Sequence, residues 1–238
     1  MTWSIIARDP ATGKFGIAVA TRFFAVGALV PYLQAGVGAV ATQALVNPFL
    51  GVNGLKLLRE GKPAAEVVQA LVAADQGRDH RQVHVMDVAG GTAAHTGTAC
   101  VDWCGHRAGA DVSLAGNMLA GERVLDATLS AFAAGGELPF PRRLIAALRA
   151  GEVAGGDKRG KQSAALVIQG DEQWPDLDLR VDDHPDPLAE LERLETVSRE
   201  RFTHFLRILP NKCDPVGLLD RDAIEQEIER SIAAQGRS

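Results

Sequence analysis

Apolar residues in the first forty-five positions follow the spacing of β-strands. Two short apolar runs, residues 3–8 and 14–21, are joined by Asp9-Pro10-Ala11-Thr12-Gly13, in which proline fixes φ and glycine supplies a positive φ. This pattern predicts a hairpin with Asp9 as the residue that closes the turn. Two more β-type segments follow at residues 28–34 and 37–43. The chain therefore opens with an antiparallel sheet and not with a β-α-β unit.

Helical and β-type blocks then alternate. Helical spacing over residues 53–60 and 64–74 is interrupted by Gly61-Lys62-Pro63, which puts proline at the start of the second helix. The later blocks are β-type runs at residues 81–87, 92–96 and 107–115, helices at 122–134 and 139–150, and a strand at 163–168. This order predicts an α+β fold over residues 1–175: two packed antiparallel sheets covered on each outer side by helices, a four-layer αββα sandwich.

The pattern changes after residue 175. Five aspartates and two prolines give residues 176–187 the character of an acidic connection. An amphipathic pattern over residues 188–209 predicts one long helix, and residues 220–234 a second, strongly charged one. Residues 188–238 are therefore expected to form a C-terminal helical extension that docks on its own body or on a partner subunit, which makes a homo-oligomer the expectation.

Composition narrows the class of protein. The net charge is −5 and the basic residues are scattered, so neither a nucleic acid nor a membrane surface is an expected partner. No apolar run is long enough to span a bilayer, and the first residues lack the pattern of a secretory signal. Three cysteines, an odd number, do not form a disulfide framework. A cytoplasmic protein is expected.

The second residue, Thr2, suggests a chemistry. If Met1 is removed, a terminal threonine carries its nucleophile and its base on one residue. An α-amino group with a pKa of about 7.7 to 8.0 can take the hydroxyl proton at neutral pH.

Six segments, in order along the chain, carry a family resemblance. They are TWSIIARDPATG (2–13), ATRF (20–23), AGVGAVATQA (35–44), AAHTG (93–97), GNMLAG (116–121) and GGDKRGKQSA (155–164). Over residues 2–186 the chain resembles an uncharacterised bacterial family of the Ntn-hydrolase-like (N-terminal nucleophile) superfamily, which includes proteasome β-subunits and penicillin acylases. The resemblance implies the αββα sandwich, and it implies that Thr2 attacks an amide carbonyl.

The resemblance also implies partners for Thr2. Proteasome-type sites have an Asp at the end of the second strand and a Lys on a following one, whereas this chain reads Ala20-Thr21-Arg22 and has no Lys in residues 29–43. The penicillin-acylase-like branch uses an Arg near this place. Arg22 is therefore a candidate to lower the pKa of the amine and to steady the oxyanion. Asn117 is a candidate oxyanion donor, with a turn asparagine as the alternative.

Other residues are candidates for binding substrate. The charges of Asp157, Lys158 and Arg159 beside small residues suit the wall of a site that grips an anionic group, with a solvated loop as the alternative. His95 is a further candidate, and a satisfied core histidine is its alternative. Residues 155–162 nearly match a phosphate loop, but Gln162 replaces the Mg-binding hydroxyl and the order of elements is reversed, so a phosphate loop is not expected.

No metal or cofactor is expected. Cys100-x-x-x-Cys104-x-His106, with His95 nearby, holds zinc-type ligands but lacks the usual Cys-x-x-Cys pairs. His80 and His84, an even number of residues apart on a strand, are interpreted as paired surface histidines.

Two functions remain. The first is an N-terminal-nucleophile amidohydrolase that acts on a small-molecule or peptide-like amide. Thr2 is its nucleophile, and Arg22 and Asn117 are its further catalytic candidates. The alternative is a non-catalytic binding or scaffold protein that retains the fold, as the missing Asp and Lys would suggest.

Overall fold

The structure is a computed structural model that describes residues 2–235. The chain forms two compact units, Met1–Leu191 and Glu192–Ser238. All the strands described belong to the first unit.

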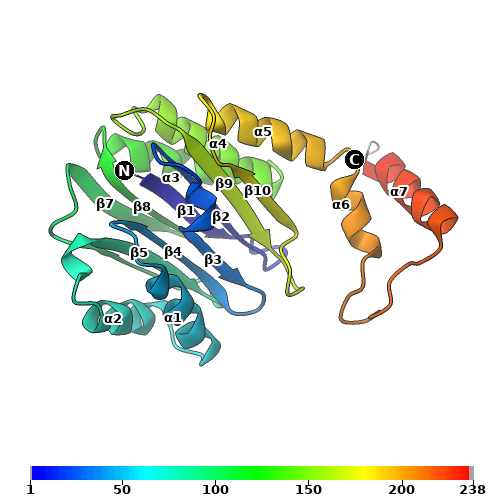
Figure 1. Cartoon of the computed structure of the whole chain (residues 1–238), viewed down its shortest axis with the longest axis horizontal. Helices are drawn as coiled ribbons and strands as arrows, with labels where there is room; N and C mark the ends of the chain where they lie inside the picture. The colour runs from blue at the N-terminus through cyan, green and yellow to red at the C-terminus, as the bar shows by residue number, and fades with distance from the viewer. Residues whose placement is uncertain (1, 236–238) are drawn as a thin grey trace. The chain divides into compact units, whose positions relative to one another are not determined.

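The first unit is built on two antiparallel sheets (Figure 1). The larger sheet has the strand order β10-β9-β2-β1-β8-β7, and the smaller has the order β3-β4-β5-β6. The strands are β1 (Thr2–Arg8), β2 (Phe15–Thr21), β3 (Pro31–Gln34), β4 (Gly38–Ala44), β5 (Arg81–Asp87), β6 (Thr92–Thr96), β7 (Trp103–Gly109), β8 (Val112–Leu119), β9 (Ser163–Gln169) and β10 (Leu177–Val181). The expected opening hairpin is confirmed, because β1 pairs with β2, and the Asp9 carboxylate accepts from the Ala11 N–H at 3.2 Å in its turn.

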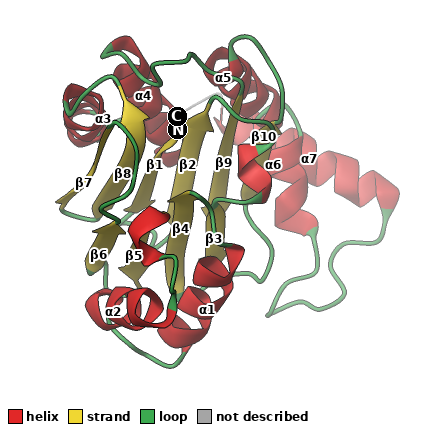
Figure 2. Cartoon of the chain, turned by 60° about the vertical axis from the view of Figure 1, so that its left-hand side comes forward, coloured by secondary structure: helices red, strands yellow, loops and turns green. Residues whose placement is uncertain are grey.

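Apolar side chains pack between the sheets and on their outer faces. Ile6, Ile17 and Val19 of the larger sheet meet Ala39 and Met86 of the smaller one. On the other face of the smaller sheet, a second core forms with helices α1 (Pro48–Arg59) and α2 (Ala64–Ala74), while α3 (Arg123–Ala134) and α4 (Phe140–Val153) pack on the larger sheet (Figure 2). The result is an α+β sandwich of two antiparallel sheets with helices.

Helix α1 begins earlier than its apolar spacing indicates. Asn47 is its N-cap, with the side-chain oxygen 3.1 Å from the Phe49 N–H, and Pro48 occupies the first helical position. The exposed Phe49 and Val52 obscure the amphipathic pattern in this first turn. Gly51 then lets the helix lie against the sheet, since a Cβ there would stand 2.2 Å from the Tyr32 ring.

Two β-type regions differ from the sequence expectation. The run expected at residues 107–115 is a hairpin of β7 and β8 that turns at Asp111, whose φ is 53°. The acidic connection at 176–187 contains β10, which pairs with β9. Leu177 and Val181 are buried in β10 while Asp178 is exposed. The sequence thus contained the alternation of apolar and polar residues typical of a strand, but its many aspartates indicated a connection instead.

The one long helix expected at residues 188–209 is wrong, whereas the helix expected at 220–234 is confirmed as α7 (Arg221–Gln235). The chain instead forms α5 (Pro187–Ser198), α6 (Phe202–Phe205) and a 3₁₀ turn η3 (Leu206–Ile208) before α7. The break after α5 coincides with the burial of His204, whose Nδ1 lies 2.8 Å from Ser231 Oγ of α7 and whose Nε2 lies 3.0 Å from the Arg199 carbonyl oxygen. A contact distant in sequence thus outweighs the helical periodicity.

Candidate functional site

Thr2 stands in a row of three polar residues at one end of the larger sheet. It is paired with Thr21 of β2 on one side and with Asn117 of β8 on the other. Directly paired residues project from the same face of a sheet, so the three side chains are neighbours. The hydroxyl oxygens of Thr2 and Thr21 are 3.1 Å apart, and all three residues are buried.

This row faces the smaller sheet. Ser4, two residues along the same face of β1, contacts Gln43 of β4 and His84 of β5. Trp3 points to the opposite face, where it lies against Gly151 of α4. The Thr2 side chain is therefore directed between the two sheets.

Gln82 of β5 fixes the orientation of the Asn117 amide. Its Nε2 lies 2.8 Å from the Gly116 carbonyl oxygen and 3.0 Å from that of Gly105, and carbonyl oxygens only accept. The other end of the Gln82 side chain must then be Oε1, which accepts from Asn117 Nδ2 at 3.1 Å and from Gln43 Nε2 at 2.8 Å. The Asn117 amide is thus held with its nitrogen toward Gln82.

The orientation of the Gln43 amide in turn fixes which nitrogen of the His84 ring carries the proton. Gln43 Oε1 accepts from the Ser4 hydroxyl at 2.6 Å, so Ser4 Oγ accepts in turn from His84 Nε2 at 2.9 Å. His84 Nδ1 then accepts from the Ser113 hydroxyl at 3.0 Å. The imidazole is neutral, because burial, with a smaller contribution from His106, lowers the pKa of His84 to about 3.

The expectation that His80 and His84 form a surface pair is wrong. His84 is completely buried and His80 is exposed. Spacing placed His84 on a face of the strand, but only the second sheet packing on that face buries it.

Asp157 lies in line with β1, beyond Thr2. On one edge of β8, Leu119 pairs with Trp103 of β7, and on the other edge it forms an isolated bridge with Asp157. That second edge is the one on which β1 pairs, with Thr2 opposite Asn117. The Asp157 carboxylate is buried and accepts from the backbone N–H groups of Arg22 at 3.1 Å and of Arg159 at 2.7 Å.

The three basic candidates are exposed, and two of them, Arg22 and Arg159, contact this carboxylate. Arg159 Nη2 lies 3.4 Å from Asp157 Oδ2 and 3.4 Å from the Arg22 carbonyl oxygen. Lys158 Nζ lies 3.8 Å from an Asp102 carboxylate oxygen. Arg22 contacts Asp157 through its backbone, while its guanidinium is exposed. The structure thus places Thr2, Arg22, Asn117, Asp157, Lys158 and Arg159 at the same end of the larger sheet.

A cavity of about 290 Å³ opens beside Asn117. Its other lining residues are Ala44, Leu45, His80, Ala99, Cys100, Val101 and Met118. Ala44 and Met118 have positive φ angles of 69° and 56°, which non-glycine residues rarely adopt. Backbone strain of this kind is concentrated at functional sites.

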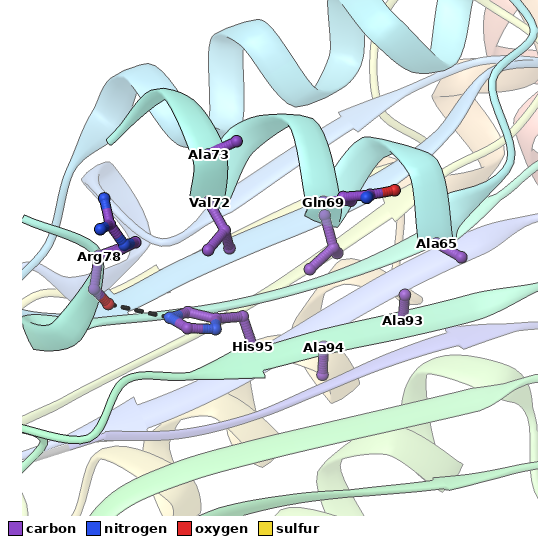
Figure 3. A pocket seen from close by; sticks show the side chains of 9 residues that line it. Ala65, Gln69, Val72, Ala73, Arg78, Ala93, Ala94 and His95 are labelled. Atoms are coloured by element: carbon purple, nitrogen blue, oxygen red, sulfur yellow. Dashed lines mark hydrogen bonds between the residues drawn. The ribbon is translucent and has the colours of Figure 1, made fainter. Parts of the chain in front are cut away.

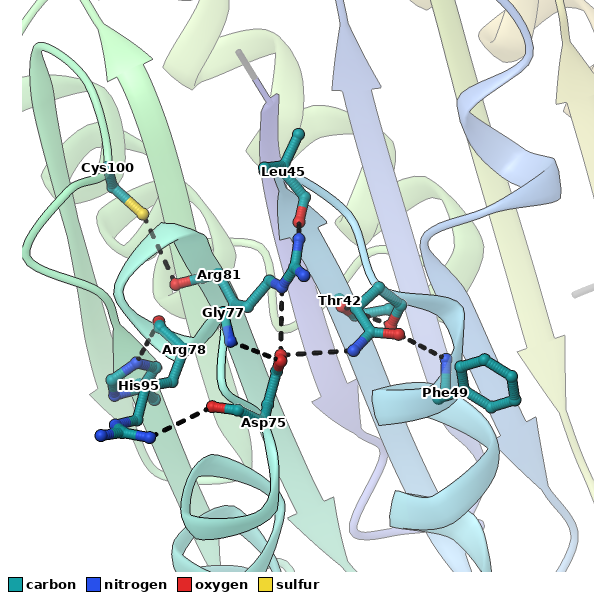
Figure 4. A network of polar contacts seen from close by, with 10 residues as sticks. Thr42, Leu45, Phe49, Asp75, Gly77, Arg78, Arg81, His95 and Cys100 are labelled. Atoms are coloured by element: carbon teal, nitrogen blue, oxygen red, sulfur yellow. Dashed lines mark hydrogen bonds and ion pairs between the residues drawn. The ribbon is translucent and has the colours of Figure 1, made fainter.

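A network of polar contacts centred on Asp75 holds one wall of this cavity (Figure 4). The Asp75 carboxylate accepts from Gly77 N–H, Asn47 Nδ2 and Arg81 Nε at 2.9 to 3.2 Å. Arg81 also donates from Nη1 to the Leu45 carbonyl oxygen at 2.5 Å. Burial opposes ionisation of Asp75, but these hydrogen bonds hold its pKa below the ordinary value.

His95 lies elsewhere. Its Nε2 is 2.9 Å from the Arg78 carbonyl oxygen, and with α2 it lines a separate groove of about 500 Å³ (Figure 3). Thr96, the next residue of β6, contacts Gln82, so His95 projects from the opposite face of the smaller sheet. The structure does not bring His95 together with Thr2.

Sequence reasoning missed Gln43 and Gln82. A signal was present, because Gln82 and His84 are polar at alternate positions of a strand whose neighbours Val83 and Val85 are buried. Among residues 2–235 no three His, Cys, Asp or Glu side chains lie close enough together to hold a metal ion. Over the same residues, no helix combines the length and the apolar character needed to cross a membrane.

Comparison with known proteins relates the chain to one family. The sequence pattern of DUF1028, described as a family of unknown function, matches residues 2–191. The crystal structure of protein SPO2555 from Silicibacter pomeroyi, of the same family, is similar with a TM-score of 0.85 and 36% identity, covering 92% of this chain and 99% of that one. Anbu (ancestral beta-subunit) from Yersinia bercovieri gives a TM-score of 0.40 and 12% identity, covering 82% of this chain and 94% of that one. No curated protein matched the chain.

Proposed function

The chain belongs to the DUF1028 family, a family of unknown function, and we propose that this member is an N-terminal-nucleophile amidohydrolase. The observation that carries the proposal is the surroundings of Thr2. Its hydroxyl contacts that of Thr21, its strand partner Asn117 lines a cavity, and a buried carboxylate stands in line with the start of its strand.

The proposed reaction begins after removal of Met1. The free amine of Thr2 takes the hydroxyl proton while Oγ1 attacks the carbonyl carbon of an amide. The C–N bond then breaks, and the leaving amine departs with the proton. A water molecule, deprotonated by the same amine, hydrolyses the resulting ester to a carboxylic acid and restores Thr2.

Neighbouring residues have distinct roles in this proposal. The Asn117 amide donates one N–H to Gln82, and its other N–H donates to the oxyanion. Asp157 accepts a hydrogen bond from the terminal amine and orients it, while Arg159 offsets the charge of this carboxylate. Arg22 and Lys158 give this end of the sheet a positive potential that suits an anionic part of the leaving group.

Substitution of Thr2 tests the proposal. Thr2→Ala removes the nucleophile, so hydrolysis of a responsive amide should fall by at least about 10³-fold. Thr2→Ser keeps a terminal hydroxyl and is the matched control that should retain measurable activity. Turnover would be followed over an amide and lactam panel, and intact mass would report the loss of Met1.

Three results would contradict the proposal. Equal activity of Thr2→Ala and wild type would exclude Thr2 as nucleophile. Active wild-type protein that retains Met1 in every molecule would exclude the terminal amine as base. If protein without Met1 hydrolysed no member of the panel, a binding or scaffold role would be favoured instead.

A further inference from the structure

We infer that the cavity beside Asn117 is the subsite for the acyl part of the substrate, and that it takes a short, uncharged acyl chain. This inference rests on the proposed function and specifies its substrate class. Asn117 both pairs with Thr2 and lines the cavity. Paired residues of antiparallel strands are about 4.5 to 5.5 Å apart at Cα, so the wall of the cavity at Asn117 lies one strand away from Thr2.

The lining is apolar. Ala44, Ala99 and Met118 contribute alkyl or thioether surface, and Leu45 and Val101 at the rim are 63% and 60% exposed. Exposed aliphatic side chains around a hollow are typical of a site that binds an apolar group.

No Asp, Glu, Lys or Arg is among the residues that line the cavity. Burial raises the pKa of the Cys100 thiol, which donates from Sγ to the Arg81 carbonyl oxygen, so Cys100 is neutral. His80 is the one other titratable side chain that lines the cavity. Arg22 and Arg159 contact Asp157 and Lys158 contacts Asp102, and none of these three cations lines the cavity. An acyl chain that ends in a carboxylate would therefore lose its hydration without gaining an ion pair.

The cavity is also small and firmly held. Its volume of about 290 Å³ lies at the lower limit of ligand pockets, which is about 300 Å³. The Met118 N–H donates to the Val101 carbonyl oxygen at 3.1 Å, and Arg81 holds the Leu45 backbone (Figure 4). The walls on both sides are fixed by hydrogen bonds, so a long chain cannot be accommodated by simple displacement.

A series of anilides with one leaving group tests the inference. The acyl groups are acetyl, butyryl, hexanoyl, decanoyl and succinyl. We expect kcat/KM for butyryl to exceed that for decanoyl and for succinyl by at least about tenfold, the scale on which a pocket discriminates size. Ala99→Phe, which fills the cavity, should lower kcat/KM for butyryl about tenfold or more and spare acetyl. Ala133→Phe, at an exposed position of α3, is the matched control and should change neither.

A binding measurement separates this inference from the proposed function. Saturation-transfer NMR with butyramide on the Thr2→Ala variant should show binding, and the double variant with Ala99→Phe should not. If butyramide binds in this manner but wild type hydrolyses no anilide, the amidase proposal fails and the apolar subsite stands. If anilides are hydrolysed with equal kcat/KM for butyryl, decanoyl and succinyl, and Ala99→Phe changes nothing, the subsite is overturned and the amidase stands. Absence of both hydrolysis and binding overturns both.

Discussion

At the scale of single residues, two backbone carbonyls orient a chain of side chains. The carbonyl oxygens of Gly105 and Gly116 can only accept, which fixes the Gln82 amide and, through it, those of Asn117 and Gln43. The Gln43 amide then determines which atom donates and which accepts in the hydrogen bonds of Ser4, His84 and Ser113. Asn117, which lines the cavity, and the neutral His84 thus belong to one buried hydrogen-bond network. Such a network is costly to leave partly unpaired, so its members hold one another in place.

The titration of His84 is the prediction at this scale. Its pKa in the folded protein is about 3, well below the unperturbed value of about 6.5. Between these values the unfolded state binds the additional proton, so stability is greatest above pH 6.5 and falls as the pH is lowered. The contribution lost is about 1.4 kcal/mol per pH unit in this window.

Two measurements check this titration. In ¹⁵N NMR the imidazole should stay neutral, with the proton on Nε2, from pH 7 to pH 4.5. Urea unfolding should show a steeper loss of stability below pH 6.5 for wild type than for His84→Gln. A titration midpoint of His84 near 6.5 would show that the ring is not buried as described.

At the scale of elements, local capping and sheet packing decide where each helix and strand begins. Asn47 caps α1 and also donates to Asp75, so one side chain links the start of a helix to the network behind the cavity. Successive side chains of β5 lie on opposite faces, which puts Gln82 and His84 toward the larger sheet and Val83 and Val85 toward the helices. The polar network and the apolar core therefore come from the two faces of one strand.

Asn47→Ala is the prediction for this element. Loss of the cap should lower the free energy of unfolding by about 1 kcal/mol, with a further loss because Asp75 gives up a donor. Asn53→Ala, an exposed position within the same helix, is the control and should change stability by less than about 0.5 kcal/mol. Equal urea midpoints for both variants would refute the capping role.

At the scale of the whole molecule, the candidate site and the family match lie within the same unit. The first compact unit ends at Leu191, where the match to DUF1028 also ends. All the side chains placed around Thr2 and the cavity belong to this unit. Helix α5 begins in it and continues into the second unit.

A truncated chain tests this division. Residues 1–198, which keep α5 whole, should unfold in one cooperative transition and retain any amidase activity of the full chain. Calorimetry and the anilide assay would check this expectation. Loss of cooperative unfolding would show that the second unit is needed for the first to fold.

Much of the fold could be predicted from local patterns in the sequence. The β1–β2 hairpin follows from Asp9-Pro10-Ala11-Thr12-Gly13 between two apolar runs, and the alternation of helical and β-type blocks indicates two sheets with helices. These features depend on residues close together in the chain, so periodicity and turn chemistry are sufficient. Strand β10 was not predicted because the acidic composition of residues 176–187 outweighed the alternation of Leu177 and Val181. The break after α5 was not predicted because the burial of His204 against Ser231 involves residues distant in sequence.

The sequence by itself placed Thr2 just before one β-type run, residues 3–8, and Asn117 just after another, residues 107–115. Only the tertiary structure decided that these residues are neighbours, that Asp157 continues the line of β1, and that His95 faces away from them. It also decided that His84 is buried and neutral. The physical reason is that strand order and sheet-to-sheet packing depend on contacts between segments far apart in the chain, which no local pattern encodes.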